Sequence, residues 1–163
     1  MRRRKISLDR GEVKISDSDI LHTSISTCVS VCLYHPTFKI GGITHISGSR
    51  KNDTTPSGRY LKTGGFYYAD KAIPRLLELL KEKHTSIRDK SLELVVVGGL
   101  NNEGPISETL SELKKYDFKL IGYDINQNLH REVRFDTAYG IITVTRDIPF
   151  SIHKKIKSKI FYL

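Results

Sequence analysis

Long hydrophobic runs are missing from this sequence of 163 residues. No apolar stretch approaches the roughly 18–20 residues that a membrane-spanning helix needs. The basic opening MRRRK is not followed by an apolar segment, so we expect no secretory signal. Internal repeats, low-complexity stretches and Pro/Ser-rich linkers are absent as well. We therefore expect a single cytoplasmic domain over residues 1–163.

Cysteine is scarce, with Cys28 and Cys32 as the only two. Two cysteines cannot build a disulfide framework, and they suit a reducing compartment. Four residues along one strand would separate them by about 13 Å, too far for a disulfide, which predicts a packing role for Cys32. Their spacing to His35 and His45 matches no closed zinc site. We expect neither a metal nor a cofactor.

Negative charge is in the minority, because 27 Lys and Arg residues outnumber 18 Asp and Glu residues and give a formal net charge of +9. Four of the basic residues lie within 2–5 and four within 154–159, which leaves 19 basic and 18 acidic residues over 6–149. Nucleic-acid binding needs a basic face within the fold, so the near-neutral middle argues against a nucleic-acid partner. We expect the basic ends, 1–5 and 150–163, to be peripheral.

The first clear element is a hairpin. Residues 29–34 alternate in the manner of a half-buried strand. One face of this strand would carry Val29, Val31 and Leu33, and the other Cys28, Ser30, Cys32 and Tyr34. Turn residues at 35–39 and a return strand over 40–46 complete the hairpin. The polar, Gly/Ser/Thr-rich stretch 50–65 predicts a long surface loop.

Apolar spacing predicts two main helices. The first runs over 71–83, with Asp70 as its N-cap and Pro74 in its first turn. Its apolar stripe consists of Ile73, Leu76, Leu77 and Leu80. The second helix opens at Pro105 and runs to about Tyr116, with Ile106, Leu110 and Leu113 facing inward.

Strands are predicted for the rest of the chain. The apolar run 92–97 indicates a central strand with both faces covered. A strand follows over 118–123, and a second hairpin joins 132–135 to 141–145. In the tail from 149, isoleucines recur every four residues, which predicts a short basic amphipathic helix. The order of elements is typical of the α/β class, as a mixed α/β sandwich with mainly antiparallel sheets and two main helices.

The first hairpin also suggests chemistry. With its turn centred near Thr37, Cys28 faces His45 directly in one register and diagonally in the other. Either register places both side chains on one face, within the roughly 4.5–8 Å typical of such neighbours. An imidazole favours the nucleophilic thiolate and can carry a proton to a leaving amine, and a third group would orient the imidazole. The alternative from spacing alone is that Cys28 is a packing residue.

Two segments resemble a known signature. The residues TSISTCVSVCLY at 23–34 and GGITH at 41–45 resemble the chemoreceptor glutamine deamidases, the CheD family. In that family a threonine precedes a Cys-Val-x-Val strand, and Gly-Gly-x-x-His follows a short turn. Further blocks in the same order are 68–73, 97–99, Asp124, 131–135 and Gly140. Several blocks in register across residues 15–145 are stronger than any one motif.

This resemblance implies an α/β/β sandwich like the catalytic domains of deamidating bacterial toxins. It implies hydrolysis of glutamine side chains in the cytoplasmic region of methyl-accepting chemotaxis receptors, giving glutamate and ammonia. Cys28 is then the nucleophile that forms a thioester. His45 is the base and later the acid for departing ammonia, and Thr23 orients His45. Backbone N–H groups near Cys28 would hold the oxyanion. Some relatives bind a CheC-type phosphatase, which makes such a protein a candidate partner.

The sequence departs from the family pattern in loops. Where the family has Gly-Ser before the cysteine, this chain has Ser26-Thr27, and the Leu-Pro that often follows the histidine block is replaced within 46–49. The Gly-Gly expected after Asp124 is Asn126-Gln127. These departures support a second hypothesis, a catalytically weakened adaptor that binds chemoreceptors or a CheC-type phosphatase.

The remaining candidates have plainer interpretations. His22 and His130 are expected at the surface, although His22 borders the site and could assist. Arg131 and Arg134 are expected on an exposed strand face, with contact to an acidic partner as the alternative. Gly98-Gly99 is expected to form a strand-end turn, because it lacks the phosphate-binding glycine motifs.

Overall fold

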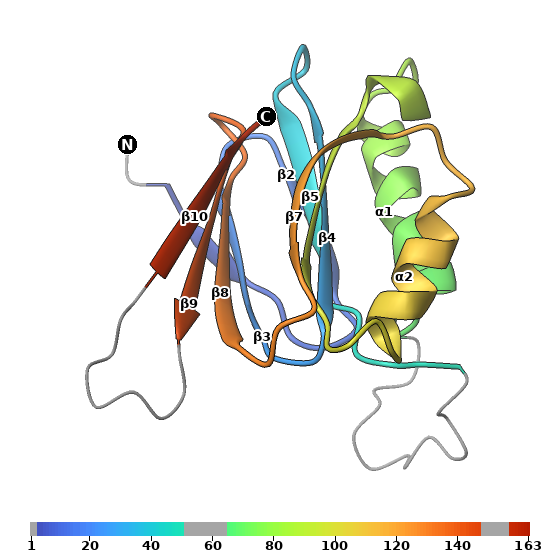
Figure 1. Ribbon diagram of the computed structural model, residues 1–163. Coiled ribbons are helices and arrows are strands. Elements are labelled where there is room, and N and C mark those ends of the chain that lie inside the picture. The colour runs from blue at the N-terminus through green and yellow to red at the C-terminus, as the bar shows by residue number, and fades with distance from the viewer. Residues whose placement is uncertain (1–2, 51–64, 148–156) are drawn as a thin grey trace.

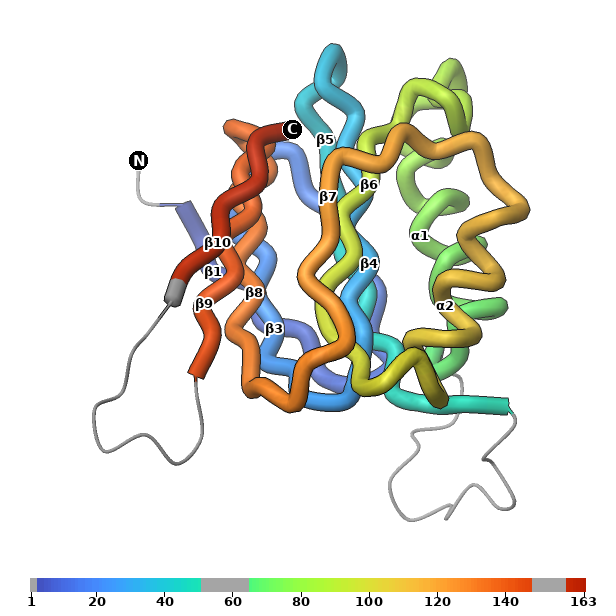
Figure 2. Tube along the Cα trace, in the orientation of Figure 1, coloured from blue at the N-terminus to red at the C-terminus, as the bar shows by residue number. Residues whose placement is uncertain are grey.

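Two β-sheets stacked face to face and a layer of helices make up the molecule (Figures 1 and 2). The computed structural model describes residues 3–50, 65–147 and 157–163. The strands are β1 (Lys5–Ser7), β2 (Val13–Ser16), β3 (Ile20–Ile25), β4 (Val29–His35), β5 (Ile40–Thr44), β6 (Glu93–Gly98), β7 (Lys119–Ile125), β8 (His130–Asp136), β9 (Ile141–Asp147) and β10 (Lys157–Tyr162). The helices are α1 (Ala69–Lys83), α2 (Pro105–Leu113) and the short 3-10 helix η1 (Asp89–Ser91).

Each sheet has five strands within the described ranges. The sheet with strand order β2-β5-β4-β6-β7 lies between the helices and the second sheet, and we call it the inner sheet. The outer sheet has the order β1-β3-β8-β9-β10. Among the described residues all strand pairs are antiparallel except β1–β3 and β6–β7, which are parallel. The predicted mixed α/β class with mainly antiparallel sheets is therefore confirmed.

Strand β4 runs through the centre of the inner sheet, and the prediction that it is half-buried was wrong. All seven of its residues are buried, because the helices cover one face and the outer sheet covers the other. The predicted division of side chains is confirmed. Val29, Val31 and Leu33 pack in the core beneath the helices, whereas Cys32 and Tyr34 pack between the sheets.

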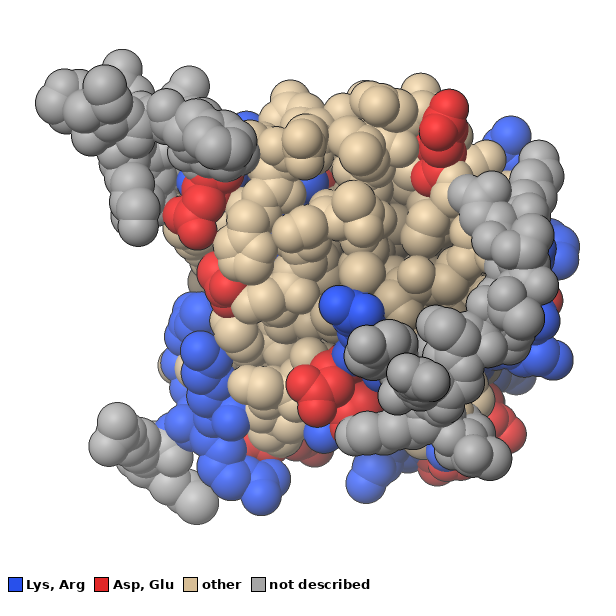
Figure 3. All heavy atoms as spheres, turned by 90° about the horizontal axis from the view of Figure 1, so that it is seen from below, with Lys and Arg blue, Asp and Glu red and all other residues tan. Residues whose placement is uncertain are grey.

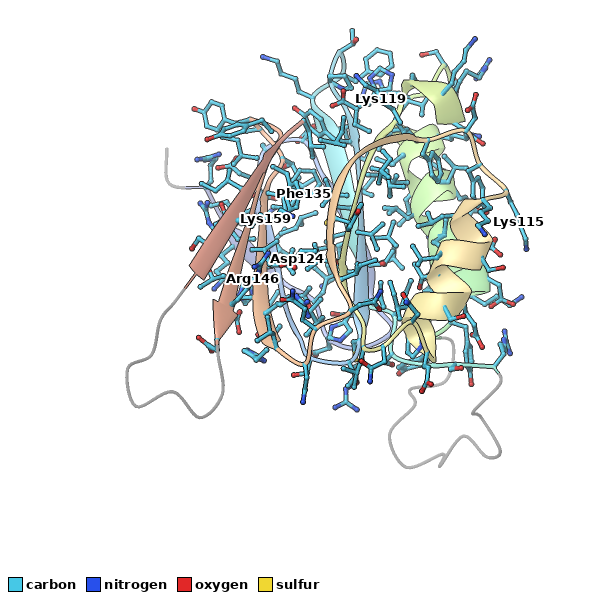
Figure 4. All side chains as sticks on the ribbon, viewed as in Figure 1. Lys115, Lys119, Asp124, Phe135, Arg146 and Lys159 are labelled. Atoms are coloured by element: carbon cyan, nitrogen blue, oxygen red, sulfur yellow. The ribbon has the colours of Figure 1, made fainter. Side chains whose placement is uncertain are left out.

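A second core fills the space between the two sheets. Phe135 on β8 is fully buried there and meets Tyr34 edge to face, with ring centroids 5.9 Å apart (Figure 4). A Cβ atom at Gly41 would lie 2.5 Å from the Phe135 ring, so glycine at this position lets the sheets approach closely. This close packing fixes the separation of the strands that carry the candidate site.

The helices follow their apolar stripes, but the predicted start of α1 was wrong. The stripe residues Ile73, Leu76, Leu77 and Leu80 are buried as expected. However, α1 begins at Ala69, two residues early, so Asp70 lies inside the first turn and Tyr68 occupies the cap position without a side-chain cap bond. Pro74 is thus the sixth helical residue rather than a first-turn residue. The second helix begins at Pro105 as predicted and ends at Leu113.

No helix in the described ranges is long and apolar enough to cross a membrane. Only Arg50 and Gly65 of the loop predicted over 50–65 belong to the described residues. Residues 148–156 of the tail also lie outside the described residues. For residues 157–162 the predicted tail helix was wrong. Residues 157–162 instead pair with β9 as an edge strand. Three isoleucines at intervals of four fit a helix, but pairing with the preceding strand β9 overrides that pattern.

Candidate active site

The connection from β3 to β4 crosses from the outer sheet to the inner sheet at one end of the sandwich (Figure 1). Thr23 lies on β3 with its side chain in the space between the sheets, and it is only 1% exposed. Cys28 ends the connection, directly before β4, and is partly buried. The short crossing therefore brings a hydroxyl from one sheet and a thiol from the other to the same end of the core.

His45 follows β5, and the observed pairing decides how it faces the thiol. Val29 pairs with Ile46, which places His45 opposite Ser30 and diagonal to Cys28. Of the two registers that the sequence left open, the structure has the diagonal one. Diagonal neighbours on one face are roughly 7–8 Å apart between Cα atoms, within reach of an imidazole. His45 is 6% exposed and faces the outer sheet.

A hydrogen bond between Thr23 and His45 fixes the imidazole. The Thr23 Oγ1 atom lies 2.8 Å from His45 Nδ1, and the same hydroxyl donates to the carbonyl oxygen of Leu8 at 3.1 Å. A hydroxyl has one hydrogen and a carbonyl can only accept, so the hydrogen between Thr23 and His45 belongs to Nδ1. The Nε2 atom is then left with its lone pair, which is the form that a general base needs.

The segment from Leu8 to Glu12, between β1 and β2, completes the surroundings of His45. The Gly11 N–H donates to the His45 carbonyl at 2.9 Å, and the His45 N–H donates to the Glu12 carbonyl at 3.1 Å. These bonds bracket His45 on both sides and bring Arg10 to the site. This segment could not be predicted from sequence, since nothing in its residues signals that it pairs with a histidine more than thirty positions away.

Burial sets the protonation of the pair. It raises the pKa of the Cys28 thiol, and Arg10 acts in the opposite direction. Burial lowers the pKa of His45; the Leu8 carbonyl raises it, Arg10 lowers it further, and Asp9 and Glu12 raise it. The free site thus holds a neutral thiol beside a neutral imidazole, not the preformed thiolate that the sequence favoured.

Cys32 differs sharply from Cys28. It is fully buried between the sheets, and burial raises the pKa of its thiol to about 12. A thiol with this pKa is almost entirely protonated at neutral pH and is a poor nucleophile. The predicted packing role of Cys32 is confirmed.

Arg10 gives the site a measurable pH signature. Its charge lowers the pKa of both Cys28 and His45, so replacing it with glutamine should raise both. We expect the alkylation of Cys28 by iodoacetamide to shift to higher pH in Arg10→Gln and to stay near its original position in Arg10→Lys. Arg134→Gln removes a charge from an exposed part of the outer sheet and is the matched control. A profile unchanged in Arg10→Gln would contradict this electrostatic role.

Backbone groups around Cys28 are held by a glycine turn. The Gly99 N–H donates to the Cys28 carbonyl at 3.0 Å, and a Cβ at Gly98 (φ +108°) would lie 2.2 Å from that oxygen. The predicted strand-end turn therefore needs glycine at Gly98. Within the described residues the N–H groups of Thr27 and Cys28 have no hydrogen-bond acceptor. They are the available donors next to the thiol.

Comparison with known proteins completes the description of the site. No family model matches the chain. It is 27% identical over 154 residues to the probable chemoreceptor glutamine deamidase CheD of Methanococcus vannielii, covering 86% of this chain and 94% of the relative. It is 26% identical over 140 residues to the chemoreceptor glutamine deamidase CheD of Thermotoga maritima, covering 78% of this chain and 81% of the relative. The probable chemoreceptor glutamine deamidase CheD 1 of Chromobacterium violaceum is 26% identical over 153 residues, covering 85% of this chain and 76% of the relative. Over most of its length the chain is therefore similar to proteins named as chemoreceptor glutamine deamidases of the CheD family.

One CheD-like block was misjudged from sequence. Arg131 was expected on an exposed face, but it is fully buried between the sheets, with its Nε 3.4 Å from Asp124. Arg146 pairs with the same carboxylate at 2.8 Å; Asp124 and Arg146 come from facing sheets (Figure 4). A buried carboxylate needs such partners, and strand alternation places Arg131 on the buried face of β8. Arg134 is exposed as predicted, with 45% of its side chain accessible.

The two histidines of the CheD-like region are placed away from the thiol. His22 neighbours Thr23 on β3, so its side chain lies on the opposite face of the outer sheet. There it bonds Glu132, which also binds His130 at 2.9 Å through its other oxygen. The surface position predicted for both histidines is confirmed, and His22 does not point toward Cys28.

Proposed function

We propose that this chain hydrolyses the side-chain amide of glutamines in the cytoplasmic region of methyl-accepting chemotaxis receptors, giving glutamate and ammonia. The observation that carries the proposal is the hydrogen bond from His45 Nδ1 to Thr23, because it leaves Nε2 as a base on the face that Cys28 shares. The names of the relatives support the choice of substrate. We also propose that the reaction takes place in the cytoplasm and that the sandwich resembles the catalytic domains of deamidating bacterial toxins.

In the first half of the reaction, Cys28 Sγ forms a bond to the glutamine Cδ atom while His45 Nε2 takes the thiol proton. The neutral pair of the free site suits this order, since the thiol loses its proton as it attacks. Negative charge develops on the amide oxygen, and the free N–H groups of Thr27 and Cys28 stabilise it. His45 then returns the proton to the nitrogen, the C–N bond breaks, and ammonia leaves a thioester on Cys28.

In the second half, water replaces ammonia. His45 Nε2 takes a proton from the water as its oxygen bonds to Cδ, and the same N–H groups hold the second oxyanion. Collapse breaks the C–S bond, and the proton returns to the sulfur. The carboxylic acid product loses its proton to the solvent to give glutamate, and the neutral thiol of Cys28 is restored. No metal or cofactor takes part in these steps.

Thr23 is a positioning residue in this scheme. Thr23→Val keeps the shape and removes the hydroxyl, which frees His45 to rotate, and we expect kcat to fall about tenfold, the value of one hydrogen bond. Thr23→Ser keeps the hydroxyl and should restore most of the rate. A structural effect alone would leave the pH profile of kcat/KM unchanged, whereas loss of the tautomer lock should displace its acid limb. Identical rates and profiles for the valine and serine variants would argue against this role.

The proposal is tested by incubating the protein with receptor cytoplasmic fragments and mapping glutamine-to-glutamate conversion by mass spectrometry. The competing function is the adaptor that binds receptors or a CheC-type phosphatase, which the departures at Ser26-Thr27 and Asn126-Gln127 favour. The two functions differ in their products. Conversion of glutamine supports the enzyme, and tight binding of an unconverted fragment supports the adaptor.

A further inference from the structure

Amide side chains are concentrated beside the candidate nucleophile. The chain has five asparagines and one glutamine: Asn52, Asn101, Asn102, Asn126, Gln127 and Asn128. All but Asn52 lie in two loops, residues 99–104 between β6 and α2 and residues 126–129 between β7 and β8. We call these two segments the amide loops. Glu103 is their single charged residue.

Hydrogen bonds attach the amide loops to Cys28 and to each other. The Gly99 N–H donates to the Cys28 carbonyl at 3.0 Å, and the Asn126 N–H donates to the Gly98 carbonyl at 3.3 Å. The Asn102 N–H donates to the Asn126 side-chain oxygen at 2.9 Å, and the Asn126 amide in turn donates to Asn102. The two loops thus form one unit next to the thiol.

The buried Arg131 side chain supports the second amide loop, residues 126–129. The Arg131 Nη1 atom donates to the Gln127 carbonyl at 3.2 Å, and Arg131 itself is held by Asp124. The Leu129 N–H donates to the same Gln127 carbonyl at 2.8 Å. Both bonds hold the carbonyl oxygen of Gln127, while the residue itself remains exposed. A loop held in this way presents its side chains at a fixed place, which lowers the entropy lost on binding.

Three of the amides are free for a partner. The side chains of Asn101, Gln127 and Asn128 belong to exposed residues and make no hydrogen bond within the described part of the chain. Figure 3 views the end of the molecule that bears these loops, and it shows a broad area without Lys, Arg, Asp or Glu. Each amide offers an acceptor and two donors, a combination that matches the amides of another polypeptide.

We propose that the amide loops are the docking surface for the polypeptide that carries the substrate glutamine, and that they select an uncharged, amide-bearing stretch. The inference rests on the proposed deamidase function for its substrate, and it adds the chemistry that chooses among glutamines. Asn126 and Gln127 stand where the CheD pattern has two glycines, so the selection belongs to this chain in particular. Asn102 and Asn126 position the loops, and the three free amides make the contacts.

The experiment compares Gln127→Ala/Asn128→Ala with the unchanged protein on a glutamine-bearing receptor fragment. Loss of two hydrogen bonds should raise KM about tenfold with little change in kcat. Alkylation of Cys28 by iodoacetamide, which needs no docking, should proceed at the same rate. Ser158→Ala alters an exposed polar side chain on β10 and is the matched control. Because the loops are nearly uncharged, raising the salt concentration should change KM little.

The outcomes separate this inference from the proposed function. An unchanged KM in the double variant overturns the docking role, and so does a parallel fall in alkylation, which would mean that the loops act through Cys28 itself. If the unchanged protein converts no glutamine, the proposed function fails, and docking is then read from fluorescence anisotropy of the labelled fragment with Cys28→Ala protein. Weaker binding in the double variant supports the docking surface in that case, and equal binding overturns it.

Discussion

Cys28→Ala should abolish glutamine deamidation, with turnover falling at least ~10³-fold because no other group at the site can form the thioester. The thermal midpoint should change little, since the side chain is small and only partly buried. The measurement is peptide mapping of a receptor fragment after incubation with each protein, together with the melting curve of each.

Cys32→Ala is the control for that experiment. Cys32 is fully buried four residues away on the same strand, so its removal should lower the melting temperature and leave turnover close to the original. Retention of deamidation in Cys28→Ala would exclude the thioester route outright. Loss of activity in both variants together with loss of the fold would instead indicate a purely structural effect of each cysteine.

The next largest effect is expected at His45. His45→Gln keeps a side-chain amide that can donate to Thr23 but removes the base, and kcat should fall by about 10²–10⁴-fold, the usual contribution of general acid–base catalysis. The pH dependence of the residual rate should also change, because the imidazole no longer titrates. His84→Gln alters a histidine at the C-terminal end of α1, where it stacks on Phe38, and should behave like the unchanged protein.

The His45→Gln variant also tests whether the Cys28 thiol and the His45 imidazole are both neutral in the free site. If the free site holds a neutral thiol and a neutral imidazole, the pH at which Cys28 becomes reactive toward iodoacetamide should be nearly the same with and without His45. A preformed thiolate–imidazolium pair would instead lose reactivity near neutral pH when His45 is replaced. The second result would contradict the burial-controlled protonation described above.

The local part of the site could be predicted from sequence because it depends on strand periodicity. The alternation after Cys28 and the short turn to His45 fix which face each side chain occupies, whatever the exact register. The register itself could not be chosen, since moving a turn of the same length by one residue along the chain exchanges the direct and diagonal pairings. In the structure, the pairing of Val29 with Ile46 makes that choice.

Long-range features could not be predicted in the same way. Strands β1 and β2 have only three and four residues, and they gain stability from their partners β3 and β5 rather than from their own residues. Strand alternation places Arg131 on the buried face of β8 with Val133 and Phe135, but its partner Asp124 comes from the facing sheet, which no local pattern reveals. The same holds for the Leu8 carbonyl, which receives the Thr23 hydroxyl from another strand.

The basic ends also acquire a structural meaning that composition alone does not provide. Lys5 lies on β1 and Lys159 on β10, and these are the two edge strands of the outer sheet. Charged side chains on edge strands discourage pairing with other chains. The Lys159 ammonium donates to the Tyr123 carbonyl on β7 at 2.8 Å and joins the edges of the two sheets (Figure 4). Part of the excess charge therefore serves the fold.

The central claim is that Cys28 becomes acylated by a protein glutamine. The most direct test is to mix the protein with a glutamine-bearing receptor peptide, quench with acid during turnover, and locate any bound peptide by mass spectrometry. The account predicts a thioester on Cys28, absent in Cys28→Ala and accumulating when deacylation is slowed. Conversion of glutamine to glutamate with no peptide ever found on Cys28, or with the peptide found on another residue, would contradict it.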